Sequence, residues 1–486
     1  MVFSSHLFLF YFLPVALLVY YALPRWGKHL ALTLLSYVFY GWANPLFFVL
    51  MLASTVVDYF CGLVMTGQFR RGAWARPLPL LEESGPRTRA QKAALVISIC
   101  SNLSLLGFFK YFNFGVESYN VLLDALGLQA LGLDVAFKIT LPLGISFYTF
   151  QSMSYSIDVY RGHARAVRNF IDFACYVSMF PQLVAGPIIR FSEVADQLRH
   201  RTYTVQKFAR GAALICLGLA KKILLANACG KIADTCFDAG SVGFFDSWYG
   251  VVAYAFQIYF DFSGYSDIAI GLGLILGFVF PKNFDSPYLS QSITEFWRRW
   301  HISLSSWLRD YLYIPLGGNR KGPARTYVNL GVVMLLGGLW HGAAWNFVIW
   351  GGIHGALLML ERLMGKKSFY RALPRPAKIL LTFVIVCFAW AFFRADNLSR
   401  ALTYCGSMLG LVEVGDAAGM LGGLIYKPYY VCTFILAAAA VWFAPQTWDW
   451  TKKIGWPKAV LLVAALWLSI VVLTTQAFNP FIYFIF

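Results

Sequence analysis

Charged residues are scarce in this sequence, and their scarcity excludes a soluble protein. Only 13% of the 486 residues are charged, 59% are hydrophobic, and the mean hydropathy is +0.61. A soluble surface requires roughly a quarter of charged residues. The chain instead contains repeated apolar runs of about 20 residues, the length that crosses the hydrocarbon layer of a bilayer. The composition therefore predicts an all-α, polytopic integral membrane protein that is embedded in a lipid bilayer.

Motifs of several enzyme classes and of metal sites are also missing. HExxH is absent and no carboxylates cluster at metal-ligand spacing, so no metal site is predicted. GxSxG is absent, so no nucleophile elbow is predicted. The nine cysteines form no CxxC pair and mostly lie inside apolar runs, which indicates small core side chains. Residues 1–21 lack a basic n-region and a small-residue cleavage site, so we expect a retained first membrane helix.

The formal charge of +17 is distributed as the positive-inside rule predicts. Lys and Arg fall in short loops between apolar runs, and no continuous basic face indicates nucleic-acid binding. The polar stretch 68–92 is rich in Lys and Arg and follows three apolar runs. We therefore expect this stretch in the cytoplasm, and the N-terminus on the outer side of the membrane.

The apolar runs predict about twelve transmembrane helices and two re-entrant segments in a single domain, 1–486. The predicted catalytic core covers about 93–394, with flanking helices at 1–66 and 428–476. The sequence contains no internal repeat of the kind that would indicate a two-fold transporter fold. The predicted spans are 6–23, 29–41, 46–65, 93–112, 139–160, 208–228, 248–280, 327–340, 345–363, 378–394, 429–444 and 459–475, and the predicted re-entrant segments are 170–189 and 300–315.

Three stretches refine this topology. The stretches 113–137 and 230–246 are poor in basic residues and are predicted to be outer loops. The apolar run 248–280 is too long for one straight span. Polar or small residues interrupt that run, which predicts a broken helix with a polar kink at a cavity wall: Asp261, Ser263, Gly264 and Asp267.

Two histidines, His301 and His341, each follow a tryptophan in this apolar chain. An ionisable side chain at membrane depth is costly and therefore indicates function. Small residues flank His341, at 337–338 and 342–344, and allow a helix or a ligand to approach closely. Because desolvation disfavours imidazolium, a buried histidine stays neutral and can act as a general base beside a hydroxyl nucleophile. The structural alternative is a packed histidine hydrogen-bonded to a carbonyl.

The sequence defines the role of His301 less closely than that of His341. It could be a second base, a proton carrier or a group that orients a substrate, or it could only anchor an interfacial helix. The topology places it on a segment entered from the cytoplasm and places His341 near the outer end of a span, so we expect two sites at different depths. His354, within GGIHG, is a weaker competitor. Three nearby positive charges also favour a neutral His301: Arg298, Arg299 and Arg309.

Two segments carry a resemblance to a known family: FWRRWHISLSSWLRDYLYIPLGGNR at 296–320 and WHGAAWNFVIWGGIHG at 340–355. Both resemble the signature of the membrane-bound O-acyltransferase (MBOAT) family, and in particular its bacterial branch of alginate O-acetylation membrane proteins. The resemblance spans most of the chain, because four further segments also look like that branch: MVFSSHLFLFYFLP, MFPQLVAGPIIR, YFDFSGYSDIAIG and NPFIYFIF.

The resemblance implies acyl transfer to a hydroxyl group, with His341 as the main catalytic residue and His301 as its partner. It also implies a tunnel that joins a cytoplasmic donor side to an acceptor on the outer side. Asp310 could instead pair with the adjacent Arg309. The residues predicted to line the tunnel are Arg298, Trp300, Asp310 and Trp340.

The resemblance further implies an acetyltransferase that moves an acetyl group across the inner membrane for O-acetylation of an exported polysaccharide. Alginate is the first polysaccharide that we expect. The expected donor is acetyl-CoA or another activated acetyl carrier, with no bound cofactor, and the basic loops could receive a phosphorylated donor. A periplasmic acetyltransferase partner protein is also expected. Peptidoglycan, another envelope polymer or D-alanyl transfer to teichoic acid fits the same scaffold. A proton-coupled transporter, motivated by the predicted broken helix at 248–280, and a non-catalytic scaffold remain as hypotheses of other classes.

Overall fold

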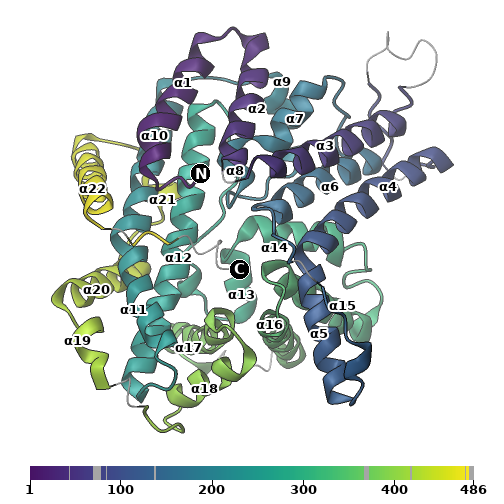
Figure 1. Ribbon diagram of the computed structural model, residues 1–486. Coiled ribbons are helices and arrows are strands. Elements are labelled where there is room, and N and C mark those ends of the chain that lie inside the picture. Colours follow the sequence, from purple (N-terminus) through teal and green to yellow (C-terminus); the bar gives the residue numbers. More distant parts are fainter. Residues whose placement is uncertain are drawn as a thin grey trace. The chain divides into compact units, whose positions relative to one another are not determined.

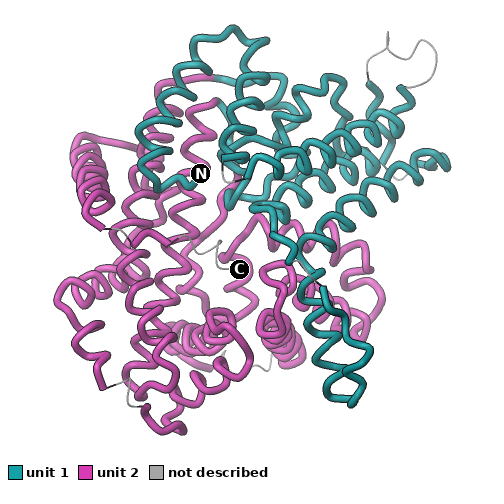
Figure 2. Tube along the Cα trace, in the orientation of Figure 1, with its two compact units in different colours: residues 1–202, 277–280 teal, residues 203–276, 281–486 magenta. Residues whose placement is uncertain are grey.

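The computed structural model describes residues 1–42, 44–68, 78–83, 85–135, 138–365, 372–415, 419–476 and 478–480. These residues form helices and contain no strand (Figure 1), which confirms the all-α prediction. The chain divides into two compact units, shown in Figure 2. Unit 1 comprises residues 1–202 and 277–280, and unit 2 comprises residues 203–276 and 281–486.

Among its described residues, unit 1 combines α-helices with two π-helices and a short 3₁₀-helix, Gln129–Leu131. One π-helix, Leu7–Phe12, runs into α1, and another, Gly107–Tyr111, joins α4 to α5. The α-helices are α1 (Leu13–Ala22), α2 (Arg25–Gly41), α3 (Pro45–Met65), α4 (Arg89–Leu106), α5 (Phe112–Ala125), α6 (Ile145–Arg161), α7 (Phe170–Ser178), α8 (Phe180–Leu183) and α9 (Phe191–Arg199).

Unit 2 contains longer helices and, in the part of it that the structure describes, two π-helices and a short 3₁₀-helix, Pro287–Leu289. Lys221–Ala226 joins α10 to α11, and Arg309–Tyr313 follows α14. The α-helices are α10 (Val205–Ala220), α11 (Asn227–Asp238), α12 (Phe244–Ile275), α13 (Ile293–Arg299), α14 (Ile302–Leu308), α15 (Gly322–His341), α16 (Trp345–Met364), α17 (Arg375–Arg394), α18 (Leu398–Met408), α19 (Gly422–Ile425), α20 (Pro428–Phe443), α21 (Thr447–Trp450) and α22 (Trp456–Thr475).

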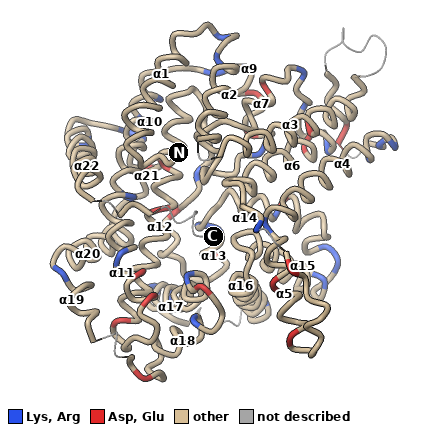
Figure 3. Tube along the Cα trace, viewed as in Figure 1, with Lys and Arg blue, Asp and Glu red and all other residues tan. Residues whose placement is uncertain are grey.

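Each of the twelve predicted spans corresponds to a helix. Within the described ranges, six helical stretches are long and apolar enough to cross a membrane: Pro45–Met65, Arg89–Ala125, Val205–Asp238, Trp345–Met364, Arg375–Arg394 and Trp456–Thr475. Two shorter apolar helices, Leu7–Ala22 and Pro428–Phe443, match two more predicted spans. The remaining four correspond to α2, α6, α12 and α15. Many Lys and Arg positions lie at helix ends, as at the starts of α2, α4 and α17 (Figure 3).

Two helices extend beyond their predicted ends. The helix predicted to end at residue 112 continues to Ala125, and the one predicted to end at residue 228 continues to Asp238. Each stops just before a glycine in the left-handed conformation, Gly127 (φ 71°) or Gly240 (φ 82°). A left-handed glycine is a common helix stop, and a charge count does not detect it. The stretches predicted to be outer loops are therefore helical at their starts.

The predicted re-entrant segment 170–189 consists of two short helices, α7 and α8. The helix breaks at Met179, two residues before Pro181. Every residue from 173 to 189 is buried, so protein covers the irregular backbone as a membrane segment requires. The break is confirmed, and the path of the segment relative to the bilayer stays a prediction.

The prediction of a broken helix at 248–280 is wrong, because α12 is one uninterrupted α-helix of 32 residues. Its two carboxylates are paired with lysines of the π-helix between α10 and α11, at 3.0 Å for Asp261 with Lys222 and 2.7 Å for Asp267 with Lys221. A carboxylate with a counter-charge on the facing helix requires no kink to reach water. The backbone irregularity therefore lies in the facing helix, not in α12.

Helices α10 and α12 pack antiparallel at backbone distance. Two glycine pairs make the contact, Gly211 with Gly271 and Gly218 with Gly264. A Cβ added at any of the four would lie 2.5–2.7 Å from the carbonyl oxygen of its partner. Small residues of this kind allow membrane helices to approach closely. The contact brings the lysines of the π-helix opposite the carboxylates of α12.

Candidate active site

The turn between α13 and α14 carries Trp300 and His301 into the interior of unit 2. Ser292 caps α13 by accepting the backbone N–H of Glu295 at 3.1 Å. His301 has a left-handed backbone (φ 41°, ψ 57°), which is uncommon outside glycine and costs about 1–3 kcal/mol. The resulting sharp turn leaves Trp300 only 2% exposed and His301 fully buried. The helix predicted at 300–315 thus starts two residues later and continues as a π-helix.

Aromatic rings enclose the imidazole of His301. The ring centroids of Phe262, Trp340 and Phe284 lie 4.6, 6.0 and 6.4 Å from its own. Complete burial among these rings disfavours the charged imidazolium of His301 and favours its neutral form.

His341 is the last residue of α15 and is half-buried. The rings of Trp350 and Phe393 each lie 5.3 Å from its own. Helix α16 approaches α15 at backbone distance, since a Cβ on Gly338 would overlap the carbonyl oxygen of Phe347. The predicted close approach at these glycines is confirmed, and it places Trp350 of α16 against the imidazole.

The structure brings His301 and His341 together, so the prediction of two sites at different depths is wrong. Their ring centroids are 6.5 Å apart. The prediction treated 300–315 as a re-entrant or interfacial helix with both ends on the cytoplasmic side. The chain instead turns sharply at His301 and brings that residue to the far end of α15. The two imidazoles therefore share one site.

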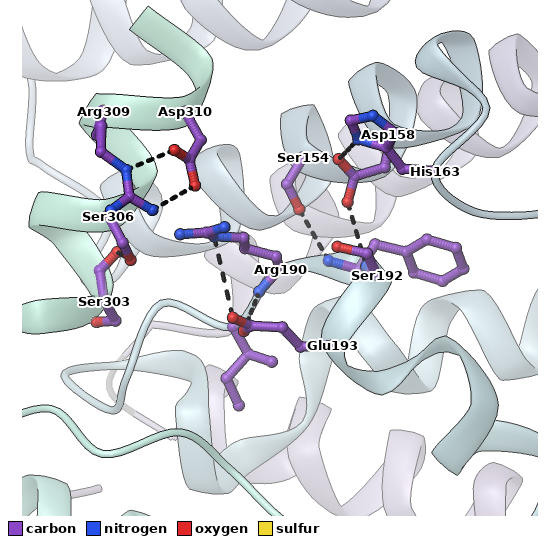
Figure 4. Close-up of polar contacts among 12 residues, drawn as sticks. Ser154, Asp158, His163, Arg190, Ser192, Glu193, Ser303, Ser306, Arg309 and Asp310 are labelled. Atoms are coloured by element: carbon purple, nitrogen blue, oxygen red, sulfur yellow. Dashed lines mark hydrogen bonds and ion pairs between the residues drawn. The ribbon is translucent and has the colours of Figure 1, made fainter. Parts of the chain in front are cut away.

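Two of the four residues predicted to line a tunnel lie at the histidines. Trp340 is 4% exposed, and its ring lies 6.0 Å from that of His301 and 5.1 Å from that of His341. Trp300 is buried directly before His301. Arg298 is exposed at the end of α13. The fourth, Asp310, forms a two-bond ion pair at 2.7 and 3.0 Å with its neighbour on the π-helix, Arg309 (Figure 4). A role of these residues in a tunnel stays a prediction.

His354, the weaker competitor, lies in a purely aromatic setting. It is fully buried, and its ring stacks on Phe296 at 6.1 Å with an interplanar angle of 7°. The indole N–H of Trp297 donates to its Nδ1 at 3.3 Å. These contacts give His354 a structural place in the layer behind the site.

Asn283 is a residue of the site that sequence reasoning missed. Its Oδ1 lies 3.1 Å from Nδ1 of His301 and accepts the backbone N–H and the hydroxyl of Ser303 at 3.2 and 2.9 Å. Its Nδ2 donates to Oγ of Ser266 at 2.9 Å, and its carbonyl accepts the N–H of Ile302 at 2.8 Å. An asparagine in a short loop belongs to no motif and no periodic pattern, so no signal in the sequence points to it.

Glu361, near the end of α16, holds the start of α13. Its carboxylate accepts the backbone N–H groups of Ile293 at 2.6 Å and Thr294 at 2.9 Å, and the hydroxyl of Thr294 at 2.7 Å. A carboxylate at a helix N-terminus satisfies donors that have no partner inside the helix. This contact fixes the segment that carries His301 against α16.

Replacing Glu361 by alanine is expected to lower the free energy of unfolding by about 1–3 kcal/mol, because buried donors lose their acceptor. Glu361→Gln keeps one acceptor oxygen and should fall between the alanine variant and the wild type. Thermal unfolding of the detergent-solubilised protein measures the effect, with the exposed Glu413→Ala as control. Equal melting temperatures for Glu361→Ala and Glu413→Ala would contradict this role.

Unit 1 contains a separate cavity of about 640 Å³. At its edge, Asp158 accepts the backbone N–H of Ser192 at 3.2 Å and lies 4.0 Å from the imidazole of His163 (Figure 4). Arg165 and Arg199 form no ion pair with any described residue, so both cations remain available to an anion. The titratable residues that line the cavity are His163, Arg165, Arg168, Asp172, Asp196 and Arg199.

An all-helical chain with membrane-length apolar helices and two adjacent imidazoles is a polytopic membrane protein with a paired-histidine site. Residues 160–395, which include both histidines, match the sequence profile of MBOAT, the membrane-bound O-acyltransferase family. The chain is 50% identical to the probable alginate O-acetylase AlgI of Pseudomonas aeruginosa, over 89% of this chain and 81% of the relative. It is 43% identical to the protein of the same name from Azotobacter vinelandii, over the full length of both chains.

The chain belongs to the membrane-bound O-acyltransferase family. It is therefore a multi-pass membrane protein and an acyltransferase of the O-acetyltransferase kind, as the resemblance predicted. It is also 37% identical to the peptidoglycan O-acetyltransferase of Helicobacter pylori, over 85% of this chain and 80% of the relative. The chain is thus similar to relatives that are named for different acceptors, alginate and peptidoglycan.

Proposed function

We propose that this protein moves an acetyl group from a cytoplasmic donor across the inner membrane for O-acetylation of an exported polysaccharide, alginate. The observation that carries the chemistry is the pair of imidazoles with ring centroids 6.5 Å apart in a buried aromatic site. The acceptor is inferred from the alginate O-acetylases that share 43–50% identity with the chain over most of its length. The N-terminus lies on the periplasmic side in this proposal.

His341 is the proposed general base, and His301 is its partner. The acceptor hydroxyl oxygen attacks the acyl carbonyl carbon while His341 takes the hydroxyl proton. The bond between the acyl carbon and the leaving group of the donor then breaks, and the proton passes from His341 to that leaving group. His301, which is buried and neutral, accepts a hydrogen bond at the same site and so holds the hydroxyl or the imidazolium of His341 in place.

The proposed donor is acetyl-CoA or another activated acetyl carrier, and a phosphorylated carrier fits best. The cavity of unit 1 supports it, since three arginines line that cavity and two of them form no ion pair among the described residues. Arginine binds phosphate through several N–H donors in a fixed plane. The proposed recipient is a periplasmic acetyltransferase partner, which completes the transfer to the polymer.

Charge reversal at the cavity is expected to raise KM for the phosphorylated donor. For Arg165→Glu and Arg199→Glu we expect a rise of roughly 3- to 10-fold each, with kcat little changed and the effect weaker at high salt. Transfer kinetics with purified protein measure this, and Arg375→Glu, in unit 2, is the control. An unchanged KM, or an equal rise in Arg375→Glu, would exclude the cavity as the donor site.

Mass spectrometry of the cell's polymers, with and without the protein, tests the proposed acceptor. Loss of acetyl groups from alginate alone is the expected result. Loss from peptidoglycan instead would favour the second candidate, which the 37% identity to the peptidoglycan O-acetyltransferase supports. The transporter hypothesis loses its motivation, because it depended on a broken helix at 248–280 and α12 is continuous.

A further inference from the structure

Asn283 offers an amide whose orientation the surrounding donors determine. It is 1% exposed. The backbone N–H of Ser303 can only donate, and it points at one side-chain atom of Asn283, so that atom is the carbonyl oxygen. On the other side, the remaining amide nitrogen donates to the hydroxyl of Ser266. The backbone N–H of Ser303 therefore requires this orientation of the amide, and the hydroxyl of Ser266, which can accept or donate, is compatible with it.

This orientation determines where the proton of His301 lies. The oxygen of Asn283 cannot donate, and the hydroxyl of Ser303, which also lies 3.4 Å from Nδ1 of His301, donates to that oxygen at 2.9 Å. Nδ1 of His301, 3.1 Å from the oxygen of Asn283, therefore carries the hydrogen. In the neutral ring the lone pair is then on Nε2. Nε2 is buried, and among the described residues it has no hydrogen-bond partner. A buried acceptor without a partner is costly. Nε2 of His354 also has no partner among the described residues, so the feature that distinguishes His301 is the ring of His341, 6.5 Å from its own.

His354 shows that neighbours, and not burial, set the tautomer in this part of unit 2. It is as buried as His301, but the indole N–H of Trp297 donates to its Nδ1. The hydrogen of His354 must therefore lie on Nε2, which is the opposite tautomer. Two buried histidines of one unit thus carry their protons on different nitrogens, each for a reason that the adjacent side chain supplies.

We infer that Asn283 is a positioning residue that holds His301 as the Nδ1–H tautomer and presents Nε2 as a hydrogen-bond acceptor at the site shared with His341. This inference rests on the proposed acyl-transfer function. Nε2 accepts a hydrogen bond from an O–H or N–H group, either the acceptor hydroxyl or the N–H of a protonated His341. Ser303 and Ser266 hold the amide in the orientation that this role requires.

The charge environment of His301 makes the role testable by pH. Around its ring lie Phe262 from α12, Phe284 from the loop of Asn283, and Trp340 with His341 from α15. Of these neighbours only His341 titrates. A carboxylate placed at position 283 would stabilise the imidazolium of His301 and raise its pKa. Since the neutral form is the active one, activity would then be lost at a higher pH as the solution is acidified.

Three variants test the inference through transfer kinetics. Asn283→Ala should lower kcat on the order of 10- to 100-fold with KM little changed, a smaller loss than removal of a general base gives. Asn283→Asp still accepts from His301 and Ser303, so it should keep kcat within a few-fold and shift the acid limb of the pH profile upward. Asn329→Ala removes an equally buried amide of α15 that donates to a backbone carbonyl, and it should leave both quantities unchanged.

Two outcomes would overturn the inference. One is an equal loss of kcat in Asn283→Ala and Asn329→Ala, at matched yield and melting temperature. The other is an Asn283→Asp variant that folds and is as inactive as Asn283→Ala, or whose pH profile does not move.

Nitrogen-15 NMR of histidine-labelled protein separates this inference from the proposed function, because the chain has only seven histidines and the shifts report the tautomer without any activity. The Nδ1–H signal of His301 should be lost or exchanged in Asn283→Ala. An unchanged spectrum would defeat the tautomer assignment and leave the acyl-transfer proposal standing. Full activity of His341→Ala together with a changed spectrum in Asn283→Ala would defeat the acyl-transfer proposal and leave the tautomer assignment standing.

Discussion

Replacing His341 by alanine is expected to abolish acetyl transfer while the protein remains folded. A general base contributes about 10²- to 10⁴-fold to the rate, and the neighbouring His301 cannot replace it without moving its ring. The side chain is half-buried at the end of α15, so its removal costs little stability. The measurements are the O-acetyl content of the polymer in cells and the transfer rate of purified protein without any ion gradient.

The matched control is His6→Ala, which removes an exposed imidazole in unit 1 and should leave acetylation intact. Equal yield and melting temperature of the two variants show that the loss is chemical. Normal acetylation in folded His341→Ala protein would rule out the proposed base. It would also revive the hypothesis of a non-catalytic membrane scaffold.

Replacing Asp261 by alanine is expected to destabilise the protein by about 3–5 kcal/mol, because it leaves a buried ammonium without its counter-charge. Lys222 is 3% exposed and lies 3.0 Å from Asp261. The same ammonium also donates to the carbonyl of Pro480, near the C-terminus. A lower yield and a large fall in melting temperature should follow.

A double variant tests whether the charge is the cause. Asp261→Ala with Lys222→Met removes both charges and should recover most of the stability lost in Asp261→Ala alone. Asp285→Ala breaks an ion pair with Lys282 whose carboxylate is 45% exposed, and it should change stability by less than about 1 kcal/mol. If Asp261→Ala alone is as stable as Asp285→Ala, the buried ion pair contributes nothing to the stability of the protein.

The positions of the helices could be predicted because hydrophobicity alone locates them. Every predicted span lies on a helix, but the ends fail where a left-handed glycine, and not a change in polarity, stops the helix. The kink expected in α12 fails for a different reason. Asp261 has its partner 39 residues away, on a π-helix, and no local pattern in α12 reveals a counter-charge on another helix.

The two histidines could be predicted as the centre of the site, because a costly residue in an apolar chain is visible in the sequence. Their proximity could not. It depends on a left-handed backbone at His301, which composition and spacing do not encode. Asn283 was invisible for the same reason, since its three acceptor contacts at Oδ1 exist only once α13 and α14 have turned back on the loop that precedes them.

The glycine pairs between α10 and α12 have a consequence for how the chain is made. The two helices are close in sequence, and the pairs recur seven residues apart on each of them, so sliding one helix along the other places a side chain against a carbonyl oxygen. Such a hairpin can find its register as soon as both helices have left the ribosome, before α15 with His341 has been synthesised. A bulky residue at Gly218 or Gly264 should therefore reduce the amount of protein that reaches the membrane, while the molecules that do assemble retain normal activity.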